Sequence, residues 1–162
     1  MHDGPIAPVP DVANDQHYEL PAQFFELVLG PHCKYSSGFW PKGVASLADS
    51  EQAALAETCA HAQLKNGQDI LELGCGWGSV TLFMARSFPE SRITAVSNSH
   101  SQRAFIEQRA KAMGLTNITV ITADMNEFAI GQQFDRIVSV EMFEHMRNYR
   151  ALLDRTRSWL RP

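Results

Sequence analysis

LELGCGWGS, residues 71–79, joins a short apolar run to the start of an amphipathic segment, and this junction decides the fold class. Gly74, Gly76 and Gly78 occupy alternate positions in it. The acidic Glu72 precedes them. Glycine permits positive φ angles and lets a ligand approach the backbone closely. A tight turn without a ligand is the simpler interpretation, but three glycines between a predicted strand and a predicted helix favour a nucleotide-like ligand.

Around this junction, short apolar runs alternate with amphipathic segments. This alternation predicts an α/β fold of the Rossmann-like type, with a partial parallel sheet in the order 3-2-1-4 and helices on both faces. Ligands of such sheets bind beyond the carboxyl ends of the strands. Strands are predicted at 69–73, 92–96, 118–122 and 134–140, and helices at about 77–87, 99–113 and 151–160.

The residues before this sheet predict two further segments. Residues 1–16 carry three prolines among small and polar residues, so we expect a flexible N-terminal lead. Residues 17–66 are expected to form a helical cap segment, and 67–162 an incomplete ligand-binding domain. Two N-terminal helices are expected, one with Pro21 at its first position, and one that begins at a capping box of Ser46 and Asp49 and ends at Asn66-Gly67.

Composition excludes several classes of function. The chain has 162 residues and a formal net charge of -4, and its Lys and Arg are scattered, so no basic stripe for nucleic acid exists. No apolar run reaches the length of about 20 residues that a transmembrane helix needs. Three cysteines without a C-x-x-C pair suit reduced thiols and a cytoplasmic location. The sequence leaves the oligomeric state open.

The spacing of the glycines narrows the choice of nucleotide. A dinucleotide fingerprint is G-x-G-x-x-G with an acidic residue about 20 positions later, whereas this turn is G-x-G-x-G and the second strand ends in AVSN, residues 95–98. A nicotinamide cofactor therefore fits poorly. The pattern resembles the first motif of class I S-adenosylmethionine methyltransferases. Asp124 follows the third strand, where it would accept a hydrogen bond from an adenine amino group or else cap a turn. Gln102 has capping-box spacing from Ser99, but its position also suits a contact with the cofactor.

Five segments together resemble the cyclopropane-fatty-acyl-phospholipid synthase family, and within it the coclaurine N-methyltransferase branch. They are YSSGFW (35–40), LELGCGWGS (71–79), AVSNSHSQRAFI (95–106), ADM (123–125) and SVEMFEHMRNY (139–149). The resemblance implies a class I methyltransferase fold that binds S-adenosylmethionine. It also implies cofactor contacts from Tyr35, Ser36, Glu72, Gly74, Gly76, Gly78, Asn98, Gln102, Asp124, Met125 and Val140.

EMFEHM, residues 141–146, is expected to form the acceptor side of the pocket. The fourth strand should end beside the first, so Glu141, Glu144 and His145 would face the glycine turn. An amine acceptor must lose a proton, and a carboxylate or imidazole can take it. The alternative without catalysis is that EMFEHM forms a solvated turn in which one carboxylate caps a helix. One His beside a strand end does not make a zincin-type metal site, so no metal is expected.

The resemblance also bears on the reaction. Cyclopropane synthases hold a bicarbonate base with a Glu and a His like Glu144 and His145 and with a Cys, where this chain has Ser37. We therefore expect methyl transfer to an amine nitrogen of a small molecule. The alternative is transfer of a methylene to unsaturated acyl chains of a lipid acceptor.

The chain ends after one helix beyond the fourth strand. Methyltransferases of this type have further strands, and this family has a C-terminal lid, so a fragment with weak cofactor binding and slow or no turnover is expected. A non-catalytic cofactor-binding or interaction module is the alternative from another functional class.

Overall fold

The computed structural model describes residues 4–8 and 20–162. Its centre is a four-stranded parallel sheet in the order β3-β2-β1-β4, as predicted. The strands are β1 (Asp69–Leu73), β2 (Arg92–Ser97), β3 (Ile118–Thr122) and β4 (Arg136–Ser139). β1 is buried along its whole length, as is usual for a central parallel strand, and this burial includes its two acidic residues, Asp69 and Glu72.

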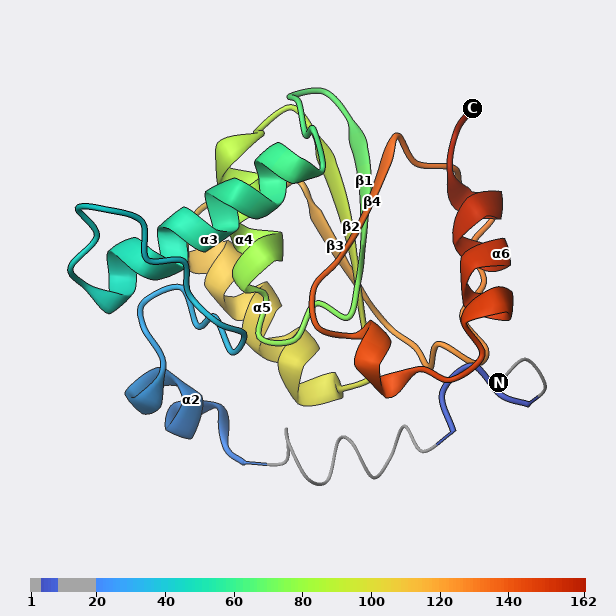
Figure 1. Ribbon diagram of the computed structural model, residues 1–162, viewed down its shortest axis with the longest axis horizontal. Helices are drawn as coiled ribbons and strands as arrows, with labels where there is room; N and C mark the ends of the chain where they lie inside the picture. The colour runs from blue at the N-terminus through green and yellow to red at the C-terminus, as the bar shows by residue number, and fades with distance from the viewer. Residues whose placement is uncertain (1–3, 9–19) are drawn as a thin grey trace.

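Helices cover both faces of the sheet, as Figure 1 shows, but unequally. α3 (Leu47–His61), α4 (Ser79–Ser87) and α5 (His100–Ala112) lie on one face. α6 (Tyr149–Trp159) lies on the other. A short helix α2 (Ala22–Val28) sits apart from the sheet, and a single 3₁₀ turn, η1 (Phe143–His145), precedes α6. Because all four strands are parallel, their carboxyl ends lie at the same end of the sheet.

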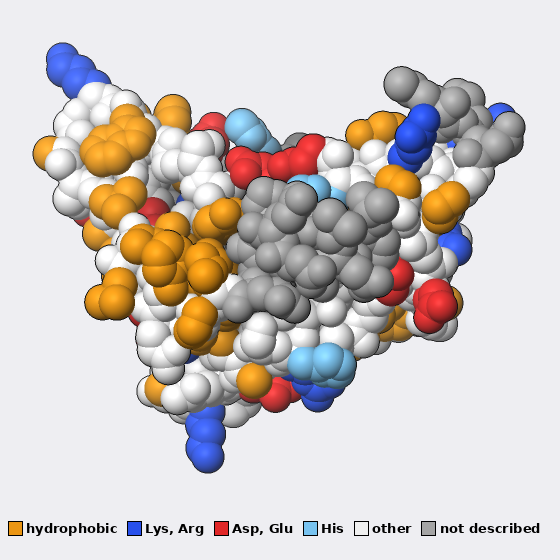
Figure 2. All heavy atoms as spheres, turned by 90° about the horizontal axis from the view of Figure 1, so that it is seen from below, with side chains coloured by type: hydrophobic (Ala, Val, Ile, Leu, Met, Phe, Trp, Pro, Cys, Tyr) orange, Lys and Arg blue, Asp and Glu red, His pale blue; other side chains and the backbone are white. Residues whose placement is uncertain are grey.

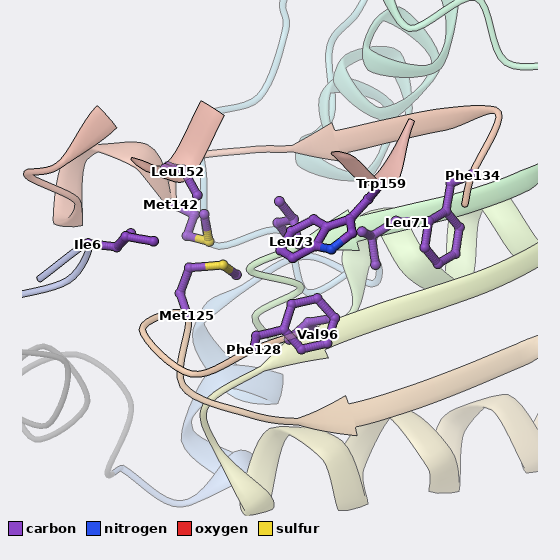
Figure 3. Close-up of a cluster of buried hydrophobic side chains, with 10 residues drawn as sticks. All are labelled: Ile6, Leu71, Leu73, Val96, Met125, Phe128, Phe134, Met142, Leu152 and Trp159. Atoms are coloured by element: carbon purple, nitrogen blue, oxygen red, sulfur yellow. The ribbon is translucent and has the colours of Figure 1, made fainter. Parts of the chain in front are cut away.

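The core under α6 joins segments that are far apart in the sequence. Leu71, Leu73 and Val96 of the sheet meet Trp159 of α6 and Ile6 of the N-terminus in one buried cluster. Figure 3 shows Ile6 extending toward Met142 and Met125 at the end of this cluster. The sheet is therefore covered on this side by α6 and by chain from both termini.

The N-terminus differs from the expected flexible lead. Ile6 and Ala7 are 3% and 4% exposed, and backbone groups of residues 4–7 form hydrogen bonds with the rest of the chain. The reason is tertiary: this short segment does not order itself, but packs against residues more than 100 positions away. The other residues of the predicted lead, 1–3 and 9–16, lie outside the described part.

Most element boundaries differ from the prediction by one or two residues, and three differences are informative. The helix expected to end at Asn66-Gly67 ends at His61, because Ala62 is its C-cap and Gln63 follows with a positive φ of 52°. Pro21 is the N-cap of α2 rather than its first residue. The expected strand 134–140 is ordered as β4 only over Arg136–Ser139.

Two further features concern the whole described chain. All three cysteines are buried free thiols. Among the described residues, no helix is both long enough and apolar enough to cross a bilayer.

Candidate cofactor and acceptor site

A cavity of about 610 Å³ opens at the carboxyl edge of the sheet, a volume typical of small-molecule sites. Every residue expected at the cofactor and acceptor sites lines it except Gly78. Those that line it are Tyr35, Ser36, Glu72, Gly74, Gly76, Asn98, Gln102, Asp124, Met125, Val140, Glu141, Glu144 and His145. The parallel topology brings most of them together, because they lie at or just after the carboxyl end of a strand. Tyr35 and Ser36 instead come from the loop between α2 and α3.

The three glycines serve different purposes. All have positive φ angles. A Cβ on Gly74 would lie 2.7 Å from the Cβ of Met142, and one on Gly78 would lie 2.5 Å from Cγ1 of Ile106. A Cβ on Gly76 would meet no atom within 4 Å. Gly78 is therefore required by helix packing rather than by the cavity, whereas Gly76 leaves room at the cavity wall.

Glu72 is a fully buried carboxyl at the floor of the cavity. Burial raises its pKa to about 8, although a hydrogen bond from Thr81 opposes the shift. The Thr81 hydroxyl donates to Oε2 of Glu72 at 2.5 Å. Glu72 is therefore largely neutral at neutral pH in the absence of a ligand, and a cation bound beside it would favour its ionised form.

Among the described residues that line the cavity, two buried polar side-chain atoms have no hydrogen-bond partner. The Oε1 atom of Gln102 accepts from the hydroxyl of Ser97 at 2.6 Å, which fixes the amide and leaves its Nε2 unpaired. The indole Nε1 of Trp77 is also unpaired. Both side chains are 2% exposed and both line the cavity. An unpaired buried donor is costly, so these groups fit a polar ligand that accepts their hydrogen bonds.

Gln102 is part of the helix cap and also lines the cavity, as its two sequence-based interpretations suggested separately. Its backbone N–H donates to the side chain of Ser99, the N-cap of α5, at 3.3 Å. The expected helix cap is therefore present, but the Gln102 side chain turns toward Ser97 rather than back to the cap. The side chain thus remains a candidate cofactor contact.

Asp124 and Met125 form the wall next to β3. Asp124 accepts a hydrogen bond from the backbone N–H of Asn126 at 2.8 Å, so it has turn geometry as well as a place in the cavity lining. Met125 is buried, and Val140 lies at the end of β4 in the same lining. An apolar ring between these side chains with a donor facing Asp124 would satisfy both parts of the wall.

The loop that carries Tyr35 and Ser36 is held from below by a buried carboxylate. Glu51 of α3 accepts from the backbone N–H groups of Gly30, His32 and Lys34 at 3.1, 3.1 and 3.2 Å. Because Glu51 is only 2% exposed, it fixes this loop against α3.

The Lys34 ammonium, buried in the same loop, donates to the Ser36 hydroxyl and, at 2.8 Å, to the Ser37 carbonyl. Burial lowers the pKa of this lysine, while Glu141 and Glu51 raise it. Lys34 therefore sets the geometry of Ser36 from outside the cavity lining.

The acceptor side is acidic and strained. Glu141 and Glu144 are exposed at the rim of the cavity, with His145 beside them on η1. Glu141 has a φ of 51°, a left-handed conformation that non-glycine residues rarely adopt. Where they do adopt it, the residue often belongs to a functional site. Figure 2 shows acidic and histidine side chains gathered at a notch of the surface. This rim suits a cationic or proton-donating acceptor.

Several lining residues were not expected. Trp77 lies within the glycine turn itself, where an aromatic side chain among glycines was an available signal. Arg147 brings a cation to the rim, and Ala7 and Pro8 come from the N-terminus. No local pattern distinguishes these last two, because only the tertiary fold places them at the cavity.

Comparisons with known proteins agree with the expected family. The chain is 39% identical over 155 residues to (S)-coclaurine N-methyltransferase from Thalictrum flavum subsp. glaucum, covering 96% of this chain and 43% of the relative. It is 35% identical over 140 residues to the cyclopropane-fatty-acyl-phospholipid synthase of Escherichia coli strain K12, covering 85% of this chain and 35% of that protein.

A solved structure matches nearly the whole chain. The crystal structure of a coclaurine N-methyltransferase bound to N-methylheliamine and SAH superposes with a TM-score of 0.95 at 35% identity, covering 99% of this chain and 46% of that one. This chain thus spans less than half the length of these relatives. The model of the family described as mycolic acid cyclopropane synthetase matches residues 9–162. The chain belongs to this family, as its five motifs indicated.

Proposed function

We propose that the protein is an S-adenosylmethionine-dependent methyltransferase that transfers a methyl group to an amine nitrogen of a small molecule. The observation that carries this proposal is that one cavity has two chemically different walls. Unpaired N–H donors and Gly76 follow β1 and β2, whereas Glu141, Glu144 and His145 follow β4, on the other side of β1. The similarity to N-methyltransferases supports the same conclusion.

The cofactor wall would hold S-adenosylmethionine through groups of different chemistry. Gly76 leaves space for close approach to the backbone, and the Gln102 amide offers a donor to ribose oxygens. Asp124 offers an acceptor to the adenine amino group, beside the apolar Met125. Tyr35 and Ser36 would close the site from above. When bound, the cofactor supplies a methyl group on a positively charged sulfur.

The acceptor wall would align and deprotonate the amine. A new N–C bond forms as the S–C bond breaks, and the amine proton passes to Glu144 or His145, which act as the general base. Glu141 adds negative charge that attracts an ammonium substrate and disfavours an anionic one. These roles require only proton transfer and alignment, which the rim residues can provide.

Transfer to an unsaturated lipid remains the second candidate, because the Escherichia coli relative is a cyclopropane-fatty-acyl-phospholipid synthase. Ser37 stands where the thiol of such enzymes is expected, which disfavours this reaction. Donor labelled in its methyl group separates the two, since the label enters either a cyclic secondary amine or the acyl chains of unsaturated phospholipid vesicles.

The test combines binding and transfer. S-adenosylhomocysteine (SAH), the demethylated product, is titrated calorimetrically into the chain and into Glu144→Gln and His145→Ala, with Glu127→Gln as an exposed control outside the cavity. We expect SAH affinity to change less than about threefold, while label transfer falls roughly 10²- to 10⁴-fold in the two rim variants. Slow transfer by the unmodified chain that both rim variants abolish supports the proposal, whereas SAH binding with no transfer to either acceptor would favour a non-catalytic cofactor-binding module.

A further inference from the structure

The N-terminal segment Gly4–Pro8 is built into the cavity rather than lying loosely on the surface. Ala7 and Pro8 belong to the lining, which also includes Asp124 and Met125. Ile6 is 3% exposed and extends toward Met125 and Met142, as Figure 3 shows. This segment precedes the range 9–162 that the family model matches. The family match therefore does not account for its contribution to the cavity, which comes from the contacts of residues 4–8 themselves.

Asn126 holds this segment through two complementary hydrogen bonds. The Ala7 backbone N–H donates to Oδ1 of Asn126 at 2.9 Å. The Nδ2 of Asn126 donates to the Ala7 carbonyl at 2.8 Å. One side-chain amide thus satisfies both backbone groups of one residue, as a neighbouring strand would.

Two further hydrogen bonds support the same segment, from the N-cap of α6 and from the residue before it. The Arg147 backbone N–H donates to the Ile6 carbonyl at 2.8 Å. The Nδ2 of Asn148 donates to the Gly4 carbonyl, also at 2.8 Å. Residues 4–7 are thus fixed along their length, and the position of Ala7 relative to Asn126 is determined by more than one contact.

Asn126 also contacts the carboxylate expected at the adenine. Its backbone N–H donates to Oδ1 of Asp124 at 2.8 Å, and its Nδ2 reaches Oδ2 at 3.4 Å. The same Nδ2 therefore serves the Ala7 carbonyl and the Asp124 carboxylate. A shift of Ala7 therefore acts on the longer of the two donor contacts to Asp124, the one from Nδ2.

We propose that Asn126 is a positioning residue that joins Gly4–Pro8 to Asp124, so that the N-terminal segment forms the adenine side of the cofactor site. This inference rests on the proposed function. The ligand group recognised here is a purine with an exocyclic amino donor, enclosed by Met125 and Pro8 and directed to the Asp124 carboxylate. Asn126 acts through Asp124 and need not touch the ligand.

The test compares two ligands that differ at one group. SAH and S-inosylhomocysteine, in which a carbonyl oxygen replaces the adenine amino group, are titrated into four proteins. These are the unmodified chain, Asn126→Ala, a chain lacking residues 1–8, and Asn66→Ala. Asn66 is the matched control, because its Oδ1 accepts from the Glu90 backbone N–H at an exposed turn outside the cavity lining. Circular dichroism establishes that each variant is folded.

We expect the unmodified chain and Asn66→Ala to prefer SAH. Asn126→Ala should bind SAH about tenfold more weakly, as the loss of oriented hydrogen bonds implies. Its preference for SAH over the inosine analogue should shrink severalfold, and the shortened chain should behave likewise. A purely structural role would weaken both ligands equally and leave their ratio unchanged. Hydrogen exchange of the Ala7 amide should slow when SAH binds, and this protection should be lost in Asn126→Ala.

The outcomes separate the inference from the proposed function. If the unmodified chain binds SAH, and Asn126→Ala and the shortened chain bind both ligands with unchanged affinities or an unchanged ratio, the inference is overturned and the proposed function stands. If the unmodified chain does not bind SAH at all, the proposed function fails and the inference fails with it.

Discussion

Burial has opposite consequences for two residues of the glycine turn region. Glu72 loses solvent around a group that can carry charge, so its pKa rises to about 8. Gly76 has no side chain to bury, and the space beside its Cα belongs to the cavity. At the scale of single residues, the site therefore depends on a carboxyl whose charge responds to a ligand and on a position where any side chain would occupy ligand space.

The raised pKa of Glu72 predicts how stability changes with pH. The folded state binds this proton more tightly than the unfolded state, so its stabilising effect is complete below about pH 4.5 and is lost as pH rises through about 8. Glu72→Gln has no such proton. The free energy of unfolding of the unmodified chain, relative to that of Glu72→Gln, should therefore fall by a few kcal/mol over this window.

Urea unfolding at intervals from pH 5 to 9 measures this difference. Glu90→Gln, an exposed site, should follow the unmodified chain. Parallel curves for the unmodified chain and Glu72→Gln would contradict the assignment of the buried proton to Glu72.

Alanine at two neighbouring glycines should separate ligand space from packing. Both positions have positive φ, so each alanine carries a backbone cost of about 1–2 kcal/mol. Gly78→Ala should lose further stability, because its Cβ meets Ile106 at 2.5 Å. Gly76→Ala should keep more stability but bind SAH at least about tenfold more weakly. Thermal unfolding and calorimetry measure both quantities, and equal SAH affinity in Gly76→Ala and the unmodified chain would show that this space is not used by the ligand.

At the scale of elements, local pattern and tertiary contact contribute differently. The strands, the helices of the sheet and the glycine turn could be predicted, because hydrophobic periodicity and capping residues are local properties. Ser46 caps α3 as expected, accepting from Asp49 at 3.1 Å. The predicted end of α3 was wrong, because the helix stops before Asn66-Gly67. Gln63, which no turn rule singles out, already adopts the left-handed conformation.

The contacts that could not be predicted are long-range. Glu51 looks like an ordinary polar residue of an alanine-rich helix, yet it is buried under Gly30–Lys34. Ile6 is one apolar residue among prolines, and its burial depends on partners such as Met142. The lining residues of the candidate site were predicted from strand ends and family motifs, whereas the side chains that support them, such as Glu51 and Asn126, needed the structure.

Glu51 should be necessary for the loop that carries Tyr35 and Ser36. Glu51→Ala leaves the N–H groups of Gly30, His32 and Lys34 without their acceptor, at roughly 1 kcal/mol each, so we expect about 3 kcal/mol less stability. SAH binding should weaken as well, because the loop loses its fixed position.

Gln52→Ala, at an exposed position of the same helix, should change neither quantity. Chemical denaturation and SAH titration provide the measurements. Unchanged stability of Glu51→Ala would mean that these N–H groups find other partners at no cost.

At the scale of the whole molecule, the two ends of the parallel strands serve different purposes. The cavity lies at the carboxyl ends of the strands. A cluster of ion pairs lies at their amino ends around Asp69, which is 2% exposed. Asp69 pairs with Arg92 at 2.5 Å and with Arg161 at 2.6 Å, and Arg161 also pairs with Asp135 at 2.7 Å. These contacts join β1, β2 and the segment after α6.

Backbone bonds extend the same junction. The Phe134 N–H donates to the Trp159 carbonyl at 2.7 Å, and the Arg161 N–H donates to the Phe134 carbonyl at 2.9 Å. The chain after α6 is thereby held in parallel alignment next to the start of β4. Because this junction lies at the end of the sheet opposite the cavity, changes there should affect the fold without altering ligand contacts.

Asp69→Asn tests that separation. The hydrogen bond from Arg92, more than any other influence, lowers the pKa of Asp69, and Arg161 acts in the same direction. An acid with a lowered pKa stabilises the fold above its unfolded pKa and loses this effect as pH falls through the folded value. Asp69→Asn should therefore lose about 1–3 kcal/mol at neutral pH, and its deficit relative to the unmodified chain should shrink below about pH 4.

Unfolding from pH 2 to 7 measures this deficit. SAH titration at 15 °C measures binding, once circular dichroism has established that both proteins are folded. Asp154→Asn, at an exposed position of α6, controls for the loss of one charge and should leave stability nearly unchanged. Equal SAH affinity in Asp69→Asn and the unmodified chain is expected, since no member of the ion-pair cluster lines the cavity. A tenfold loss of SAH affinity in Asp69→Asn would contradict this independence of the ion-pair cluster and the cavity, because it would require the two ends of the sheet to be energetically coupled through strands β1 and β2.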